Sequence, residues 1–149
     1  MDTDESEVND VSTPLADDPM PTRCPNLKLT AGDLPDAVLF PGDPVRAQAI
    51  ADRLPSARRI SANREYHSYR GEHHGVPVGV VSAGVGSAGA AVAYEEAIRA
   101  GARVLIRVGT AGALQSQLHP GDLVVVTSSV RTEGTSRQLV PVEIPAVAD

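Results

Sequence analysis

Short apolar runs recur along the chain and alternate with patterns typical of helices. Residues 37–40, 76–82, 104–108 and 123–127 are compact apolar runs that predict strands. Residues 57–74 alternate between apolar and polar positions well enough to predict strands joined by a turn. The strands are therefore expected to pair into one sheet.

Two helices are predicted between these strands. Residues 44–54 form the first, with Asp43 as the N-cap and Pro44 at the first helical position. Residues 88–100 form the second, which Gly101 ends. Because the apolar runs are too continuous for a sheet with one wet face, the pattern predicts an α/β layer fold with a largely buried sheet.

Charge divides the chain into a tail and a body. The 149 residues carry a net charge of −6, but seven of the acids precede residue 19, where there is no Lys or Arg. Residues 1–24 are therefore predicted to be an acidic disordered tail, and residues 25–149 to be the domain. From Pro19 onward the balance is 13 basic minus 12 acidic residues, or +1, which argues against a nucleic-acid partner.

The chain carries no sign of a disulfide framework, an export signal or a membrane segment. Cys24 is the single cysteine, so no internal disulfide forms, and no spacing suggests structural zinc. The acidic start lacks the apolar core of a secretory signal. Residues 76–94 are uncharged, but a proline and four glycines break them into a strand, a turn and a helix. We expect a cytoplasmic protein with no membrane partner.

The stretch from Gly42 to Arg46 predicts an anion site at a helix start. Glycine permits close backbone approach, and unpaired N–H groups with the helix dipole favour an anion. The same dipole disfavours Arg46 in the first turn, a conflict that an anion such as phosphate would resolve. An ordinary turn with an exposed arginine is the alternative.

Arg107 interrupts an apolar strand and precedes a loop of small residues. An unpaired buried guanidinium costs several kcal/mol, so Arg107 should have a partner. The carboxyl end of a strand is also where α/β folds bind ligands. Arg107 could bind an oxyanion, with the Thr110 hydroxyl beside it, or it could form a structural ion pair with Asp or Glu.

Residues 84–89 read GVGSAG and fit the GxGxxG fingerprint of dinucleotide-binding turns. The acidic residue expected about 20 positions later is missing, so these glycines are better explained by close packing and by backbone approach to a smaller ligand.

Residues 63–66 read NREY. On a strand, Arg64 and Glu65 would point to opposite faces, which suggests a partner; a decorated edge strand is the alternative.

Taken together, PGDPVR, NREY, SAGVGSAGAAVAYEE, IRVGTAGAL, GDLVVVTSSVR and EGTS followed by PAVAD resemble the nucleoside phosphorylase family, most closely its uridine branch. The likeness runs from about residue 26 to the last residue, with the segments in the family's order. It implies a three-layer α/β sandwich around a mixed sheet, and an assembly of dimers grouped into hexamers.

The resemblance also implies roles for individual residues. Gly42 and Arg46 match the family's first phosphate-binding turn, and Arg107 and Thr110 match its second. Arg64 matches an arginine that reaches into the neighbouring subunit's phosphate site.

Nucleoside contacts are expected from two further positions. Gly112 lies in the loop after Arg107. The family usually has a histidine, contributed across the dimer to the ribose 5′-hydroxyl, where this chain has Asn26, which can also form hydrogen bonds.

The implied reaction is phosphorolysis of uridine to uracil and ribose 1-phosphate. The sugar becomes oxocarbenium-like as the glycosidic bond breaks, and Arg46 and Arg107 hold phosphate in line with C1′ as the catalytic groups. Inorganic phosphate is the co-substrate, and no metal or organic cofactor is expected.

Family members continue well past PAVAD, and the part that follows carries their base-recognition residues and a glutamate that binds the ribose hydroxyls. This chain is therefore expected to be truncated at its C-terminus, with the phosphate half of a site. Two alternatives stay open, namely a purine nucleoside phosphorylase of the same family and a non-catalytic remnant that binds phosphate or pairs with a full-length subunit.

Overall fold

The computed structural model describes residues 22–149. The predicted tail falls almost wholly on residues 1–21, outside this range, and stays a prediction. Cys24 is already buried in the core, so the packed chain includes the residue before the predicted domain start. The elements are β1 (Ala37–Phe40), α1 (Pro44–Ala51), β2 (Arg58–Asn63), β3 (Tyr66–His73), β4 (Val76–Val81), α2 (Gly86–Arg99), β5 (Val104–Arg107), β6 (Ser128–Ser129), α3 (Gly134–Leu139) and β7 (Ala146–Val147).

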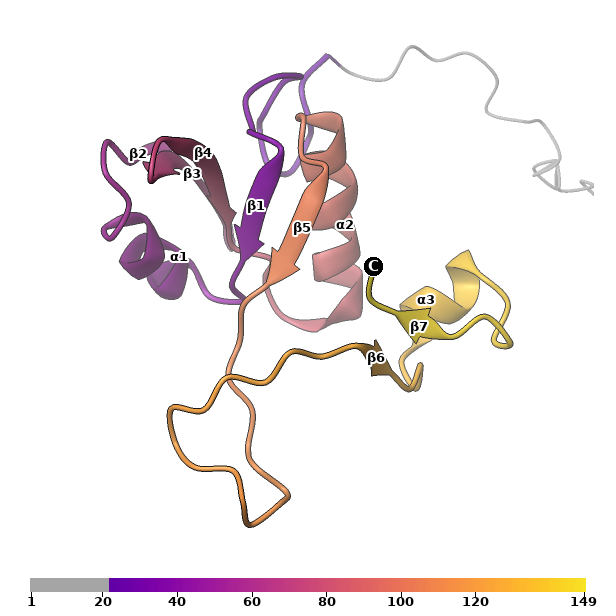
Figure 1. The fold of residues 1–149 in the computed structure, drawn as a ribbon. Helices are drawn as coiled ribbons and strands as arrows, with labels where there is room; N and C mark the ends of the chain where they lie inside the picture. The colour runs from indigo at the N-terminus through magenta and orange to yellow at the C-terminus, as the bar shows by residue number, and fades with distance from the viewer. Residues whose placement is uncertain (1–21) are drawn as a thin grey trace, which may run out of the picture.

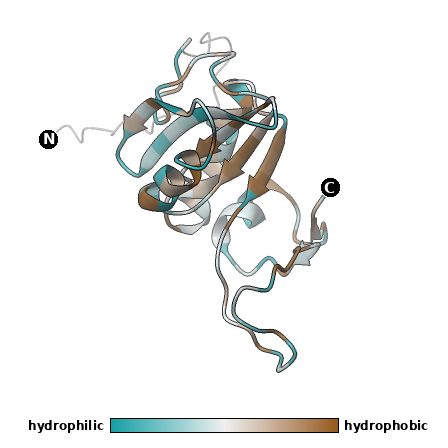
Figure 2. Ribbon diagram, turned by 60° about the vertical axis from the view of Figure 1, so that its left-hand side comes forward, coloured by the Kyte–Doolittle hydropathy of each residue, from teal (hydrophilic) through white to brown (hydrophobic). Residues whose placement is uncertain are grey.

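The main sheet is mixed and has five strands in the order β2-β3-β4-β1-β5. β1 lies between β4 and β5 and is parallel to both, whereas β2, β3 and β4 form an antiparallel meander. The three parallel strands therefore end at the same edge of the sheet (Figure 1). Figure 2 shows that apolar residues concentrate on these strands, while the β2–β3 hairpin is more polar.

Helices α1 and α2 cover opposite faces of the sheet, which gives the three layers that the family resemblance implied. Successive strand residues point to opposite faces, so Val80 packs with α1 and Val81 with the α2 cluster. The α2 cluster is the larger and includes Phe40, which is 0% exposed. The predicted α/β sandwich around a mixed sheet is confirmed.

The helices begin and end close to the predicted residues. Asp43 caps α1 and Pro44 is its first residue, as predicted, although α1 ends at Ala51 rather than at residue 54. α2 starts two residues earlier than predicted, and the chain leaves it at Gly101, whose φ of 121° suits glycine. Within residues 22–149, no helix is both long and apolar enough to span a membrane.

The predicted strand at 123–127 is wrong. Residues 123–127 form no strand in the part of the chain that the structure describes. The Thr127 carbonyl accepts a main-chain hydrogen bond from Ala148 at 2.9 Å, and the nearby strand is the two-residue β6, which pairs with β7. Leu123 is 96% exposed. The expectation of a largely buried sheet also fails at β5, where Val104 and Ile106 stay exposed on one face. A strand needs a partner for its backbone groups, and an apolar run cannot specify one.

Candidate functional site

Three loops meet where the parallel strands end. Gly42 follows β1, Gly84 follows β4, and Arg107 is the last residue of β5. A Cβ placed on Gly42 would lie 3.1 Å from Nη2 of Arg107 and 3.6 Å from the Gly84 carbonyl oxygen. Only glycine leaves the guanidinium this much room at position 42. Gly42 and Arg107, which the resemblance assigned to two separate phosphate-binding turns, therefore lie side by side.

The Arg107 side chain is held by main-chain carbonyls. Its Nη1 donates to the carbonyl oxygens of Phe40 and Val108, each at 2.8 Å. The ion pairs formed within residues 22–149 do not include Arg107, so the alternative of a structural ion pair with Asp or Glu is wrong for this part of the chain. Arg107 is also exposed rather than buried. Its partners fix its position and leave its positive charge uncompensated.

Tyr94 is a neighbour of this site that sequence reasoning missed. Its ring meets that of Phe40 edge to face, with centroids 4.9 Å apart. Burial raises the pKa of the Tyr94 hydroxyl, and the charge of Arg107 opposes that rise. An aromatic residue on the inward face of a predicted helix was the available signal.

The start of α1 differs from the prediction in one respect. The Asp43 carboxylate accepts hydrogen bonds from the main-chain N–H groups of Val45 at 3.2 Å and Arg46 at 3.3 Å, and Pro44 has no N–H. The Asp43 carbonyl accepts from Ala47. The N–H groups of Val45, Arg46 and Ala47 are therefore paired at the helix start rather than free, and anion binding by this turn stays a prediction. The half-buried Arg46 would act through its side chain.

Arg64 and Glu65 form the turn between β2 and β3, so the expectation that they lie on a strand is wrong. Arg64 is exposed and has a φ of 53°, a left-handed conformation that only a turn accommodates. A Cβ on Gly84 would lie 2.9 Å from Cγ of Glu65. The turn thus packs against the loop after β4, which explains one glycine of the GVGSAG segment by close packing.

Within residues 22–149, no hydrogen bond joins the remaining predicted residues to Arg107. Thr110 and Gly112 are exposed in the long loop after β5, and a Cβ on Gly112 would meet nothing within 4 Å. Asn26 is half-buried in the loop before β1, where its side-chain nitrogen donates to Glu96 at 2.7 Å. Gly42 and Arg107 are therefore close neighbours, and all of the assigned roles stay predictions.

The described part of the chain offers no clustered metal ligands, and its one thiol is buried. Residues 22–149 contain no group of three or more His, Cys, Asp or Glu side chains placed to hold a metal ion. The Cys24 thiol is buried and donates to the Glu96 carbonyl oxygen at 3.5 Å. Burial is the largest cause that raises its pKa, so Cys24 is a poor nucleophile.

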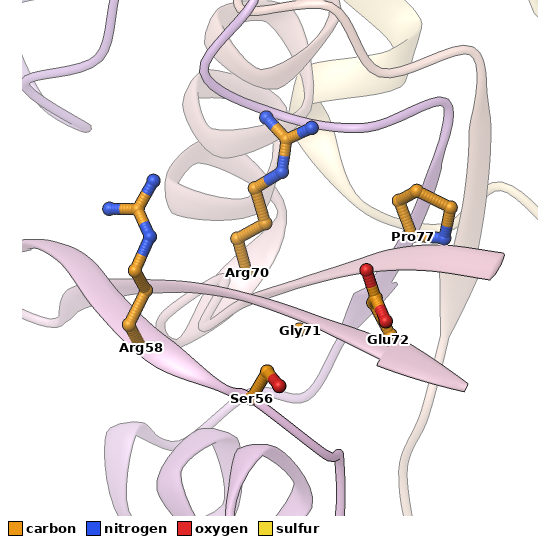
Figure 3. Close-up of a pocket in the computed structure, with 6 residues that line it drawn as sticks. All are labelled: Ser56, Arg58, Arg70, Gly71, Glu72 and Pro77. Atoms are coloured by element: carbon orange, nitrogen blue, oxygen red, sulfur yellow. The ribbon is translucent and has the colours of Figure 1, made fainter. Parts of the chain in front are cut away.

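A hollow of about 190 Å³ lies on the β2–β3–β4 meander, away from the predicted site. Arg58 and Arg70 face each other across β2 and β3, and Figure 3 shows their side chains on the same side of the hairpin. Nη1 of Arg70 donates to the carbonyl oxygens of Gly32 and Asp33, at 3.3 and 3.4 Å. Two arginines and one glutamate line the hollow, which leaves a net charge of +1. Because Arg70 already donates to two main-chain carbonyls, we assign the hollow no chemistry.

A second hollow, of about 400 Å³, separates α2 from the C-terminal segment. Its polar groups bond to one another. Ser87 pairs with Thr135 at 2.9 Å, and Glu133 accepts from both the main chain and the hydroxyl of Ser136. The hydrogen bonds from Ser136 lower the pKa of Glu133 to about 2. These contacts fasten α3 to α2, and we assign the hollow no chemistry.

The sequence of this chain matches a known protein family and several known enzymes. Residues 36–149 match the family model described as the phosphorylase superfamily. A uridine phosphorylase from Thermococcus kodakarensis is 47% identical over 118 residues, which are 79% of this chain and 43% of that protein.

Two solved structures share the fold. A uridine phosphorylase from Vibrio fischeri gives a TM-score of 0.81 at 30% identity, covering 87% of this chain and 54% of that one. A purine nucleoside phosphorylase from Toxoplasma gondii gives 0.82 at 33% identity, covering 86% and 52%. The chain thus spans about half the length of the relatives it matches.

Proposed function

Because this chain belongs to the phosphorylase superfamily, we propose that it carries the phosphate-binding half of a nucleoside phosphorylase that acts on uridine. Inorganic phosphate attacks C1′, the bond from C1′ to the base breaks, and uracil leaves with that electron pair and takes up a proton. The products are uracil and ribose 1-phosphate.

The observation that carries the proposal is the anchored, uncompensated charge of Arg107 against Gly42. Two carbonyls hold the guanidinium, and a glycine gives an oxyanion room to approach it. A fixed positive group beside the attacking phosphate acts by positioning and by electrostatic stabilisation. Arg46 adds a second charge from the first turn of α1.

The rest of the site is assigned by the family likeness. Thr110 adds a hydroxyl to phosphate, and Gly112 lies beside the nucleoside. Arg64 and Asn26 complete the site of a neighbouring subunit, to phosphate and to the ribose 5′-hydroxyl, so the working form is a homo-oligomer. Nucleoside salvage in the cytoplasm is the corresponding cellular role.

A purine nucleoside is the second candidate substrate. The Toxoplasma purine nucleoside phosphorylase matches this fold as well as the Vibrio uridine phosphorylase does. We favour uridine because the uridine phosphorylase from Thermococcus kodakarensis is 47% identical to this chain, whereas a guanosine phosphorylase from Halorubrum lacusprofundi is 39% identical.

The test measures base release from uridine, inosine and adenosine, each with and without phosphate. We expect uracil release that requires phosphate. Release from inosine or adenosine alone would favour the purine candidate. Stabilisation against heat by phosphate, without turnover of any nucleoside, would favour a non-catalytic phosphate-binding remnant.

The matched variants are Arg107→Ala and Arg103→Ala. Removing Arg107 should cost about 3 kcal/mol of transition-state stabilisation and abolish the thermal shift with phosphate. Arg103 lies just before β5 in an exposed ion pair with Asp36, so its loss should leave both readouts unchanged. Equal behaviour of the two variants would contradict the assignment.

A further inference from the structure

Glu96 is a buried carboxylate that the proposed reaction does not use. It lies on α2 among Ala93, Ala97 and Ala100 and is 4% exposed. Its oxygens accept hydrogen bonds from the main-chain N–H of Asn26 at 3.0 and 3.1 Å, and from that of Leu27 at 2.6 Å. Burying a carboxylate is costly unless it is hydrogen-bonded. The donors that compensate this one come from a single two-residue loop segment.

The same carboxylate fixes the side chain of Asn26. Nδ2 of Asn26 donates to Oε1 of Glu96 at 2.7 Å. A carboxylate accepts hydrogen bonds and cannot donate, so the amide must present its nitrogen to Glu96. Oδ1 of Asn26 then has no hydrogen-bond partner within residues 22–149, which leaves it available as an acceptor.

The network continues from Asn26 to the turn that carries Arg64. Nδ2 of Asn63, the last residue of β2, donates to the Asn26 carbonyl oxygen at 2.7 Å. On the other side of the turn, the Tyr66 hydroxyl donates to the Gly89 carbonyl oxygen at 3.2 Å. Both sides of the turn are thus tied to α2, one directly and one through Asn26 and Glu96.

We infer that Glu96 is a positioning residue that holds Asn26 and Arg64 as one preassembled arm for the neighbouring subunit's active site. The inference rests on the proposed function, in which both residues act across a subunit boundary. Asn26 and Arg64 are far apart in sequence, and the Glu96–Asn26–Asn63 relay is the set of contacts that joins their segments. Because the arm is already ordered, phosphate binding in the neighbouring site does not have to supply the free energy of ordering it.

The first experiment examines the Glu96–Asn26–Asn63 relay without phosphate, by amide exchange and NMR relaxation. Glu96→Gln replaces one acceptor oxygen with an NH2 group that faces N–H donors. We expect the amides of Asn26 and Leu27 to exchange at least about tenfold faster, and the Arg64 amide order parameter to fall from about 0.85 toward 0.6. Glu95→Gln makes the same change at the adjacent exposed residue and should alter neither. Loosening confined to residues 26–27, with Arg64 unchanged, would overturn the relay.

Asn63→Ala provides a second variant in case Glu96→Gln does not fold. It removes only the link between Asn63 and the Asn26 carbonyl. The order parameter of Arg64 should fall while the amides of Asn26 and Leu27 stay protected. An unchanged Arg64 amide in this variant would also overturn the relay.

The second experiment tests action across the boundary by complementation. Glu96→Gln should weaken phosphate binding about tenfold, and Arg107→Ala should abolish it. A site that combines Arg107 from the first variant with the arm of the second is intact. Co-expression of the two should therefore restore wild-type phosphate affinity in part of the sites, whereas either variant alone should not.

The outcomes separate the two proposals. The role of Glu96 would be overturned if the co-expressed variants did not regain wild-type phosphate affinity in part of their sites. It would also be overturned if the Glu96→Gln chain bound phosphate as tightly as the wild type. A wild-type chain that binds no phosphate would overturn the proposed function itself, while the NMR experiment still reports on the relay.

Discussion

Two parts of this chain have similar apolar patterns and different structures. Residues 37–108 pack into a sheet with a helix on each face, whereas residues 109–149 are mostly exposed and contain only two short strands and a short helix. Phe40 in β1 is 0% exposed, whereas Val125 is 87% exposed although residues 123–127 are also apolar. An apolar run therefore forms a core strand only where the fold provides it with neighbours.

The two parts also use charged groups differently. In the packed part, carboxylate and guanidinium groups hold loops in place. Glu96 binds the 26–27 segment, and Arg107 binds the carbonyls at the strand ends. In the C-terminal segment, Arg131 donates to the carbonyl oxygens of Ser136, Val140, Pro141 and Ile144 and closes the segment on itself. Elements distant in sequence are connected in the first case and nearby residues in the second.

The largest expected contrast is in stability. Phe40→Ala removes a fully buried ring that packs edge to face on Tyr94 and should lower the free energy of unfolding by about 3–5 kcal/mol. Val125→Ala should change it by less than about 0.5 kcal/mol, because the side chain is exposed. Urea denaturation followed by circular dichroism measures both. A comparable loss for Val125→Ala would mean that residues 123–127 are packed in solution.

The second contrast concerns two glycines of the predicted site. A Cβ at Gly42 would press on the Arg107 guanidinium, whereas one at Gly112 meets open space. Gly42→Ala should shift the guanidinium and weaken phosphate binding about tenfold, measured by titration calorimetry. Gly112→Ala is the matched control. Stability should hardly change in either variant, because the crowded atom is the far end of a flexible side chain.

Local signals explain which elements could be predicted. The strand at 37–40 and the helix that follows were predictable because the apolar run, the Asp43 cap and Pro44 all act within a few residues. Residues 123–127 have as good a strand pattern as 104–108, but pairing depends on a distant neighbour that local pattern does not specify. The exposed outer face of β5 was unpredictable for the same reason.

Some residues of the candidate site could also be predicted from local sequence signals, and others could not. The two candidate anion sites were found because each holds a charge that breaks a local rule: Arg46 in the first turn of a helix and Arg107 in an apolar strand. Tyr94 follows the helical pattern and was missed. Glu96 was also missed, although it is the one charged residue on the buried face that it shares with Ala93, Ala97 and Ala100. A buried charge on an otherwise small apolar face was the signal that could have found it.

A smaller effect is expected at the cap of α1. Asp43→Ala removes the acceptor for the N–H groups of Val45 and Arg46 and should cost about 1 kcal/mol of unfolding free energy. Asp43→Asn keeps a capping oxygen and should recover most of it. Because α1 carries Arg46, the alanine variant should also bind phosphate less tightly. Equal stability of the two variants would contradict a capping role for Asp43.

The smallest expected effect is the acid response of α3. Hydrogen bonds from Ser136 hold the pKa of Glu133 at about 2, below its usual 4.5, so the folded form of this segment binds the proton less readily than the unfolded form. Its contribution to stability is fully present above pH 4.5 and is lost as the pH falls toward 2.

NMR titration of the Glu133 carboxyl carbon should show this low pKa, and α3 should lose order over the same interval. In Ser136→Ala the pKa should return toward 4.5, since both the hydroxyl and the geometry that aligns the main-chain donor are disturbed. The pKa of Asp33, which is lowered by the main-chain and hydroxyl donors of Thr30, is the internal reference and should not move in that variant. If Glu133 titrates near 4.5 in the wild-type chain, the hydrogen bonds that cap α3 do not persist in solution.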